Sequence, residues 1–335
     1  MSRLRLALIG AGTFARKAHA PAYAALQERC QVVAVYSRSH ASAAAVAALL
    51  PQPVMIYDHI PSLLAAEKLD AVDIVLPIPL LPEATALALA AGVHVVSEKP
   101  IAPSLAQARP LLDLHRQRPG QVWMVAENWR YEEAYVRAGQ AIRDGRIGRP
   151  LTCDFSLQLP VPPGSPNYRT AWRRSGDFPG GFLLDGGIHH AAGLRLVLGE
   201  VESVGAVVAQ QRDDLPPADT LAAWLRFANG VIGSYTVTYA AGSPLGDNGL
   251  HVVGTQGSLR VTTQKLIIQR GDERTEESFG LPYSTHRGLA AFVESALTGA
   301  PHRNSPEEAL ADLAIVEALL AAGESGMAVS VASDF

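Results

Sequence analysis

The sequence predicts an α/β protein, with a doubly wound parallel sheet at the N-terminal end and then an α/β domain with a large open, mostly antiparallel sheet. The chain has 335 residues, more than a single hydrophobic core usually serves, so we expect two domains. Short apolar runs alternate with helical patterns as far as residue 126. Beyond that point, apolar and polar residues alternate in longer runs, which are joined by turn pairs such as Asn-Gly and Gly-Asp.

The expected N-terminal elements alternate between strand and helix. Residues 4–9 form a continuous apolar run, as in a strand that is covered on both faces. A helix over 13–28 follows, and we expect an interruption near Pro21 because proline lacks a backbone donor. Further strands are expected at 31–36, 53–57, 72–76, 93–97 and 121–126, with helices between them at 41–50, 61–68, 82–91 and 104–117. This repeated order predicts a parallel sheet with helices on both faces.

The expected C-terminal elements are mainly strands, followed by two helices. Strands are expected at 201–210, 220–228, 231–239, 250–254 and 258–263, and helices at 285–298 and 306–322. The Pro- and Gly-rich stretch 160–181 reads as a long loop, and long loops in compact domains often carry function. We therefore place a dinucleotide-binding domain at 1–127 and a substrate-binding and oligomerisation domain at 128–335.

Composition excludes several classes of partner. The formal charge is −4 and 18% of residues are charged, so no basic surface for nucleic acid or an anionic membrane is expected. No apolar segment approaches the ~18 uncharged residues of a membrane span. Cys30 and Cys153 are too few for a disulfide framework or a thiolate metal site, which fits a reducing cytoplasm. Small molecules are the expected partners.

Gly10, Gly12 and Ala15 form a G-x-G-x-x-A motif between the first expected strand and helix. Glycine permits a tight turn there and lets a pyrophosphate approach the N-terminus of the helix. Because the motif lies in a β-α-β unit, we favour a dinucleotide site over a purely structural turn. We expect Thr13 and Phe14, inside the motif, to belong to that site.

The end of the second strand indicates which dinucleotide binds. NAD sites usually place an acidic residue about 20 positions after the motif, whereas Ser37 and Arg38 stand here, Ser37 being 22 residues after Ala15. A guanidinium and hydroxyls suit a 2′-phosphate, and no carboxylate is present to repel it. NADP(H) is therefore preferred, with NAD(H) as the second candidate. The alternative is that Arg38 is a solvated loop charge.

Glu98, Lys99 and Pro100 follow the strand expected at 93–97, whose carboxyl end lies where open α/β sheets bind ligands. Lys99 could hydrogen-bond a substrate oxygen, and exclusion of solvent would lower its pKa towards a useful range. Pro100 would fix the turn, and an X-Pro bond allows a cis form there. The alternative is a surface lysine after a strand.

Asp185 and His189 lie four residues apart in the segment 180–190, so they share a face if the segment is helical. A carboxylate and an imidazole beside a nicotinamide can handle the proton that accompanies hydride transfer. The alternative makes Asp185 a helix cap and His189 a core histidine. His190 raises a metal alternative, but neighbouring histidines on a helix diverge by ~100° and no third ligand is evident, so we expect no metal.

Six motifs, taken in their order along the chain, resemble those of the family of glucose-fructose oxidoreductase, inositol dehydrogenase and MocA. They are G-x-G-x-x-A at 10–15, Glu98-Lys99-Pro100, Trp172-Arg173, Asp185-x-x-x-His189, GTQGSL at 254–259 and the closing segment 292–331. The resemblance implies an N-terminal Rossmann domain and a C-terminal α/β domain whose open sheet commonly forms the dimer interface, hence a homodimer or homotetramer. It maps the family's catalytic lysine, aspartate and histidine onto Lys99, Asp185 and His189, with the lysine and histidine bracketing the substrate carbon.

Some positions depart from the family pattern. Pro77 matches the segment after the fourth strand, but Ile78 and Leu81 stand where many relatives carry asparagine and histidine. Ala192 replaces a second aspartate after the helix histidine. These departures argue against transferring inositol or glucose specificity to this chain. The cofactor-lining residues implied by the resemblance are Pro77, Glu98 and Lys99.

Substrate-binding residues are expected in the C-terminal domain and its 160–181 loop. Aromatic faces and guanidinium donors suit sugar hydroxyls or a carboxylate. The candidates are Asn128, Arg130, Tyr131, Tyr168, Arg169, Trp172, Arg173 and His189. The alternative interpretation is that Arg173 and Arg174 form a solvated edge of the domain and bind no substrate.

The leading interpretation is a cytoplasmic NADP(H)-dependent oxidoreductase that acts on a secondary alcohol or ketone of a sugar, polyol or related small molecule. The alternative is a catalytically silent dinucleotide-binding regulator of the same fold. Retention of Lys99, Asp185 and His189 together favours the enzyme. A third hypothesis, metal-dependent hydrolysis around His189 and His190, would need an intact metal site and no nicotinamide.

Overall fold

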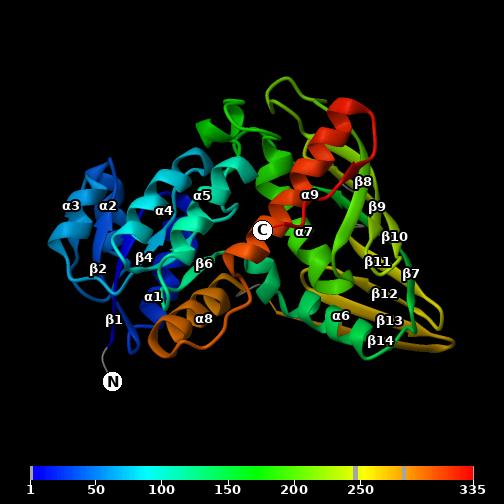
Figure 1. Cartoon of the computed structure of the whole chain (residues 1–335), viewed down its shortest axis with the longest axis horizontal. Coiled ribbons are helices and arrows are strands. Elements are labelled where there is room, and N and C mark those ends of the chain that lie inside the picture. Colours follow the sequence, from blue (N-terminus) through cyan, green and yellow to red (C-terminus); the bar gives the residue numbers. More distant parts are fainter. Residues whose placement is uncertain (1–2, 244–247, 281–283, 335) are drawn as a thin grey trace. The chain divides into compact units, whose positions relative to one another are not determined.

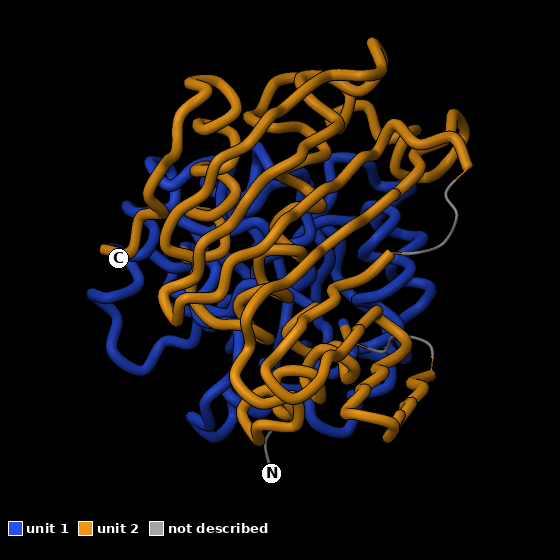
Figure 2. The backbone as a smooth tube through the Cα atoms, turned by 90° about the vertical axis from the view of Figure 1, so that its right-hand side faces the viewer, with its two compact units in different colours: residues 1–128, 285–310 blue, residues 129–284, 311–335 orange. Residues whose placement is uncertain are grey.

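The computed structural model describes residues 3–243, 248–280 and 284–334. The chain forms two compact units (Figure 2). The first unit comprises Met1–Asn128 and Thr285–Leu310, and the second comprises Trp129–Ser284 and Ala311–Phe335. The first change of unit falls one residue after the expected end of the dinucleotide-binding domain. Residues 285–310, which we expected in the C-terminal domain, pack with the first unit instead.

The sheet of the first unit is parallel throughout its described strands (Figure 1). Its six strands are β1 (Leu4–Ile9), β2 (Cys30–Tyr36), β3 (Met55–Tyr57), β4 (Ala71–Ile74), β5 (His94–Ser97) and β6 (Trp123–Val125). They lie in the order β3-β2-β1-β4-β5-β6. The chain adds β2 and β3 on one side of β1 and then crosses over to add β4, β5 and β6 on the other side, so the strand order reverses between β1 and β4. The predicted doubly wound sheet is confirmed, and ligands of such sheets bind at the carboxyl ends of the strands near this reversal.

The helices between the strands of the first unit lie close to their predicted positions, apart from a change at the start and an unpredicted short turn at 78–80. The expected helix over 13–28 is a π-helical turn, η1 (Ala15–His19), followed by the short helix α1 (Ala20–Ala25). Pro21 lacks the N–H that would bond to the carbonyl four residues earlier, so a regular α-helix cannot run through this segment. The other elements are α2 (His40–Ala47), α3 (Ile60–Ala66), η2 (Ile78–Leu80), α4 (Leu81–Ala90), α5 (Leu105–Arg116) and α8 (Ser284–Thr298).

The described strands of the second unit form one nine-stranded sheet in the order β14-β13-β12-β11-β7-β10-β9-β8-β15. They are β7 (Pro150–Gln158), β8 (Val201–Ala209), β9 (Thr220–Phe227), β10 (Ile232–Thr238), β11 (Gly249–Gly254), β12 (Ser258–Val261), β13 (Lys265–Arg270), β14 (Glu273–Ser278) and β15 (Val329–Ser330). Among the pairings of these strands, β7 with β10 is parallel and the others are antiparallel. The predicted mostly antiparallel sheet is confirmed.

Helices cover one face of this sheet. They are α6 (Glu133–Arg143), α7 (Phe182–Leu198) and the later part of α9 (Pro306–Ser325), with the short turns η3 (Asn128–Tyr131) and η4 (Ala171–Arg174). Helix α6 lies against β12 and β13, α7 lies against β9, and Gly323 of α9 faces Val208 of β8. On the opposite face Val207, Trp224 and Ile232 are 71%, 48% and 58% exposed.

In the described segments, no helix combines the length and apolar character that a membrane span requires.

Candidate active site

The glycine turn of the first unit has the geometry that a dinucleotide phosphate requires. Gly10 has φ +121°, and a Cβ there would lie 2.1 Å from the carbonyl oxygen of Val75, so no larger residue fits. Its N–H donates to the carbonyl of Tyr36 at 3.0 Å. A Cβ on Gly12, in contrast, would meet no heavy atom within 4 Å. The turn is therefore packed against the sheet on one side and leaves room for a ligand on the other.

The residues after this turn begin the π-helical segment. Thr13 and Phe14 are exposed, and Ala15 is fully buried where η1 starts. The N–H of Arg16 donates to the carbonyl of Gly12 at 3.2 Å. Exposed residues before a buried helix start fit a nucleotide that approaches this end of the segment.

The end of β2 presents hydroxyl groups and a guanidinium beside the start of α2. The Ser37 hydroxyl accepts a hydrogen bond from the N–H of Ser39 at 3.2 Å. The Ser39 hydroxyl caps α2 by accepting from the N–H of Ser42 at 3.3 Å. Arg38 is exposed between the two serines. A helix start with a guanidinium next to it favours an anion.

The segment after β4 carries the departures from the family pattern. Pro77 is half-buried and precedes η2. Ile78 and Leu81 are buried, so apolar core contacts replace the polar groups that many relatives place here. On α7, Ala192 is likewise fully buried. None of these three positions offers a polar side chain to a ligand.

Glu98, expected at the cofactor, directs its carboxylate to a buried histidine instead. Its Oε1 lies 3.0 Å from Nε2 of His19, and its Oε2 accepts the backbone N–H of Lys99 at 3.2 Å. Nδ1 of His19 lies 2.6 Å from Oδ2 of Asp73. His19 and Asp73 are fully buried and Glu98 is 7% exposed. Sequence reasoning missed this cluster, although an aspartate inside the apolar strand Ala71–Ile74 is a signal, because a buried carboxylate needs a partner.

Lys99 is partly exposed and lies two residues after β5, at the carboxyl edge of the parallel sheet. The Lys99–Pro100 peptide is cis, the form that the sequence allowed for. Glu98, immediately before it, is one of the buried cluster's carboxylates. The lysine therefore extends from a backbone segment that is hydrogen-bonded to the interior of its unit.

In the second unit, Asp185 and His189 lie one turn apart on α7, as their spacing predicts. Asp185 is not a side-chain cap, because Gly181 occupies the N-cap and no side chain caps the helix there. Its Oδ2 accepts a hydrogen bond from Nε of Arg173 at 2.6 Å. The guanidinium of Arg173 also lies 4.3 Å from the ring centroid of Trp172. Arg173, predicted to bind substrate, thus forms an ion pair with the predicted catalytic carboxylate.

The two neighbouring histidines of α7 have different surroundings. His189 is half-buried and stacks on Trp129, with 5.9 Å between ring centroids and 14° between ring planes. His190 is buried, and its Nδ1 lies 2.7 Å from the hydroxyl of Tyr235. We considered that His189 could be a core histidine, but the buried histidine of this pair is His190. Sequence reasoning missed Trp129, which is an aromatic residue in the segment that we expected to line the substrate site.

The remaining candidates divide between the loop and the interior. The guanidinium of Arg174 lies over the ring of Tyr168, 4.3 Å from the ring centroid. The backbone carbonyl of Tyr168 accepts a hydrogen bond from Nε of Arg174 at 2.7 Å. Arg169 is exposed and Asn128 is half-buried. Arg130 is 4% exposed and binds both carboxylate oxygens of Asp312 at 2.6 Å, so it serves the interior of the second unit. Tyr131 is also buried.

Comparison with known proteins identifies the family. Residues 4–126 match the oxidoreductase family with an NAD-binding Rossmann fold, and residues 135–260 match the GFO/IDH/MocA C-terminal domain. Dehydrogenase FPY6 of Fusarium mangiferae is 32% identical over 336 residues, covering 94% of this chain and 95% of that protein. The chain belongs to the GFO/IDH/MocA family. The predicted family is thus confirmed, and the protein is an oxidoreductase with an NAD-type Rossmann unit.

Two further relatives of this GFO/IDH/MocA protein extend the comparison. The 1,5-anhydro-D-fructose reductase of Ensifer adhaerens is 30% identical over 261 residues, which are 74% of this chain and 76% of that protein. The crystal structure of an oxidoreductase from Thermotoga maritima matches with a TM-score of 0.92 at 30% identity, covering 98% of this chain and 99% of that one. The fold of both units is thus that of a solved family member.

Proposed function

We propose that the protein transfers a hydride between NADP(H) and a secondary alcohol or ketone of a sugar, polyol or related small molecule. The observation that carries this proposal is the acid-base pair of α7, in which Asp185 and half-buried His189 lie one turn apart. In the first unit, Lys99 is a further candidate for proton transfer, at the ligand-binding edge of the parallel sheet. The similarity to 1,5-anhydro-D-fructose reductase supports a sugar-like substrate.

Gly10 and Gly12 would hold the dinucleotide, whose nicotinamide would supply or accept the hydride. The protein's own side chains would handle the accompanying proton: Lys99 or His189 would donate it to the carbonyl oxygen in reduction and take it back in oxidation. Asp185 lies one turn from His189 on the same helix. Arg173 holds Asp185 in place.

Activity is tested with a panel of sugars, polyols and keto sugars, including 1,5-anhydro-D-fructose, followed by the absorbance of NADPH. We expect turnover with at least one secondary alcohol or ketone in the panel. Confirmed dinucleotide binding without any turnover across a broad panel would instead favour the silent regulator of the same fold.

The choice of NADP(H) depends on the end of β2. We expect the parent to bind NADPH more tightly than NADH, and Arg38→Ala to remove most of the difference, about tenfold or more, because a charge-assisted hydrogen bond to the 2′-phosphate is lost. Fluorescence titration with both dinucleotides measures the two affinities. Arg146→Ala removes another exposed guanidinium, in the second unit, and should change neither affinity. Equal affinities in the parent would remove the argument from Ser37 and Arg38.

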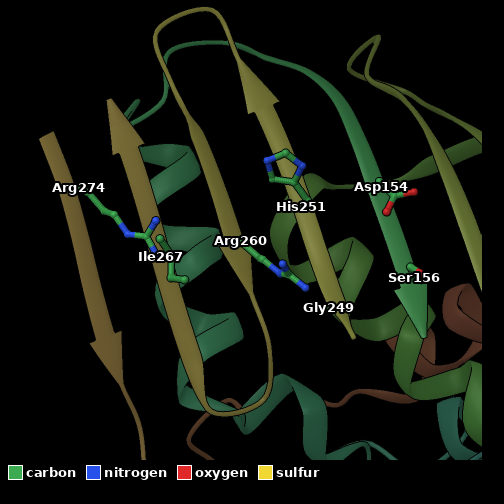
Figure 3. A pocket seen from close by; sticks show the side chains of 7 residues that line it. All are labelled: Asp154, Ser156, Gly249, His251, Arg260, Ile267 and Arg274. Atoms are coloured by element: carbon green, nitrogen blue, oxygen red, sulfur yellow. The ribbon is translucent and has the colours of Figure 1, made fainter. Parts of the chain in front are cut away.

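We also propose that the protein forms a homodimer or homotetramer through the open face of the nine-stranded sheet. The strand register places Val207, Trp224 and Ile232 on one face, and the Trp224 indole lies over Gly205. A hollow of about 520 Å³ lies on the same face (Figure 3), away from α7 and therefore distinct from the acid-base pair. Its lining includes Asp154, Arg260 and Arg274, charges of both signs that can pair across a two-fold axis.

Trp224→Glu tests this interface. A carboxylate at a half-exposed aromatic position should dissociate the assembly, because it would be buried without a partner on association. We expect light scattering after size exclusion to give a monomer mass for this variant and a multiple of it for the parent. Met55→Glu, at a similarly exposed apolar residue of the first unit, should leave the mass unchanged. A monomeric parent would contradict the proposal.

The two cysteines bear on the proposed cytoplasmic location. Cys30 and Cys153 are both free and buried. Burial raises the pKa of each thiol to about 12, with Asp73 adding to the effect for Cys30 and Asp154 for Cys153, so both remain protonated and unreactive. Free thiols are usual in a reducing compartment, so we propose a cytoplasmic location.

A further inference from the structure

A buried chain of three ionisable side chains runs through the first unit. It joins Asp73 in the middle of β4, His19 at the end of η1 and Glu98 directly after β5. His19 lies between the two carboxylates, 2.6 Å from Asp73 and 3.0 Å from Glu98. These elements are distant in sequence, so the histidine connects the glycine-turn segment, the centre of the sheet and the Lys99 segment.

The surroundings of His19 favour a proton on each of its ring nitrogens. Both nitrogens face carboxylate oxygens, and a nitrogen can bond to an ionised carboxylate only by donating. Burial alone would lower the pKa of His19, but the charge and hydrogen bond of Asp73, and then those of Glu98, raise it to about 10. The nearby Tyr23 of α1 stays neutral, because burial and the charge of Asp73 raise its pKa well above the ordinary value. One buried cation thus lies between two buried carboxylates.

This chain of contacts ends at the backbone of Lys99. One oxygen of Glu98 binds His19 and the other accepts the N–H of Lys99 at 3.2 Å. His19 also contacts Phe14 of the glycine turn, edge to face, with 5.2 Å between ring centroids. The orientation of the Glu98 carboxylate, and with it the hydrogen bond that restrains the Lys99 backbone, therefore depends on one imidazolium.

We propose that His19 is a positioning residue for Lys99, an inference that rests on the proposed role of that lysine. His19 does not touch the substrate in this account. It holds Glu98 in one orientation and so fixes the backbone from which the Lys99 side chain extends, while Asp73 keeps the ring protonated and oriented. A displacement of about 1 Å in a reacting group can lower a rate by about 100-fold, so loss of this support should appear in turnover.

Two amide variants separate the two hydrogen bonds. The amide nitrogen of His19→Asn falls near the position of Nδ1 and can donate to Asp73, whereas that of His19→Gln falls near Nε2 and can donate to Glu98. If the bond to Glu98 positions Lys99, kcat should fall by about 10–100-fold in His19→Asn and clearly less in His19→Gln. The KM of the best panel substrate and the affinity for NADPH should stay close to the parent values in both variants.

The comparison includes Lys99→Ala, so that failure of this inference and failure of the proposed function can be told apart. If Lys99→Ala keeps full turnover, the proposed role of the lysine is wrong. If Lys99→Ala loses turnover but His19→Asn keeps it, the positioning role alone is wrong. Equal kcat in the two amide variants would assign His19 to stability, which thermal melting measures separately.

A measurement on the unmodified protein tests the same inference without turnover or cofactor. In protein labelled with ¹⁵N-histidine, we expect His19 to show two slowly exchanging ring protons whose shifts do not change between pH 6 and 8. His19→Gln identifies these signals by their loss. A His19 ring that carries one proton, or that titrates in this range, would overturn the proposal even if no substrate were known.

Discussion

Lys99→Ala is expected to lower turnover by about 100-fold or more, the loss that follows removal of a positioned proton donor. The ammonium group is the proposed partner of the substrate oxygen, and alanine leaves no proton donor at position 99. Affinity for NADPH should stay within about twofold of the parent, because the turn at Gly10 and Gly12 and the hydroxyls after β2 are unchanged. Steady-state kinetics with the best panel substrate and fluorescence titration with NADPH measure the two quantities.

Lys68→Ala is the matched control for this variant. Lys68 is an exposed lysine of the same unit, and its removal should leave both turnover and affinity unchanged. Unaltered turnover in Lys99→Ala would exclude the lysine from the reaction. A loss of dinucleotide affinity as large as the loss of turnover would make it a cofactor-binding residue instead.

The parallel sheet could be predicted because its strands have a distinctive pattern. A strand covered on both faces, such as β1, is a short continuous apolar run, and the helix after it has a different period. The glycine turn could be placed for the same reason, since the motif falls between the two patterns. Edge strands carry no such signal: β14 is polar on both faces, and the sequence gives no apolar alternation to find it by.

The supporting contacts of the candidate site could not be predicted because they join residues that are distant in sequence. The hydrogen bonds of His19 reach 54 and 79 residues along the chain, to Asp73 and Glu98. The pairing of Arg173 with Asp185 depends on the path of an irregular loop, which has no period to read. Periodicity predicts the face of a helix or strand on which a residue lies. The residue that it contacts from another element depends on the tertiary fold, which periodicity does not predict.

The assignment of residues 285–310 to the first unit illustrates the same limit. The helical pattern of this segment, which forms α8 and the first turn of α9, identifies an apolar face but not the unit that the face packs on. In the first unit, the N–H of Val125 in β6 donates to the carbonyl of Asn304, and the Asn304 side chain donates to the carbonyl of Glu127. These hydrogen bonds, together with the buried side chains of Leu289, Phe292 and Val293, attach the segment to the first unit.

Asp312→Asn is expected to reduce the free energy of unfolding by about 3–5 kcal/mol, the usual cost of removing one partner from a buried ion pair. Asp312 is 1% exposed and lies between the guanidinium groups of Arg130 and Arg195, with nitrogen-oxygen distances of 2.6 and 2.7 Å. The asparagine is similar in shape but neutral. Arg195 keeps Glu200 as a partner, whereas Arg130 loses the carboxylate that it binds through both oxygens.

Lys265→Ala breaks an exposed ion pair in the same unit and serves as the control. The groups of Lys265 and Glu276 are 45% and 40% exposed, so solvent screens their attraction and less than about 1 kcal/mol should be lost. Guanidinium unfolding followed by tryptophan fluorescence compares the two variants with the parent. Equal small losses in the two variants would contradict this prediction. They would mean that the buried network contributes no more to the free energy of unfolding than an exposed ion pair does.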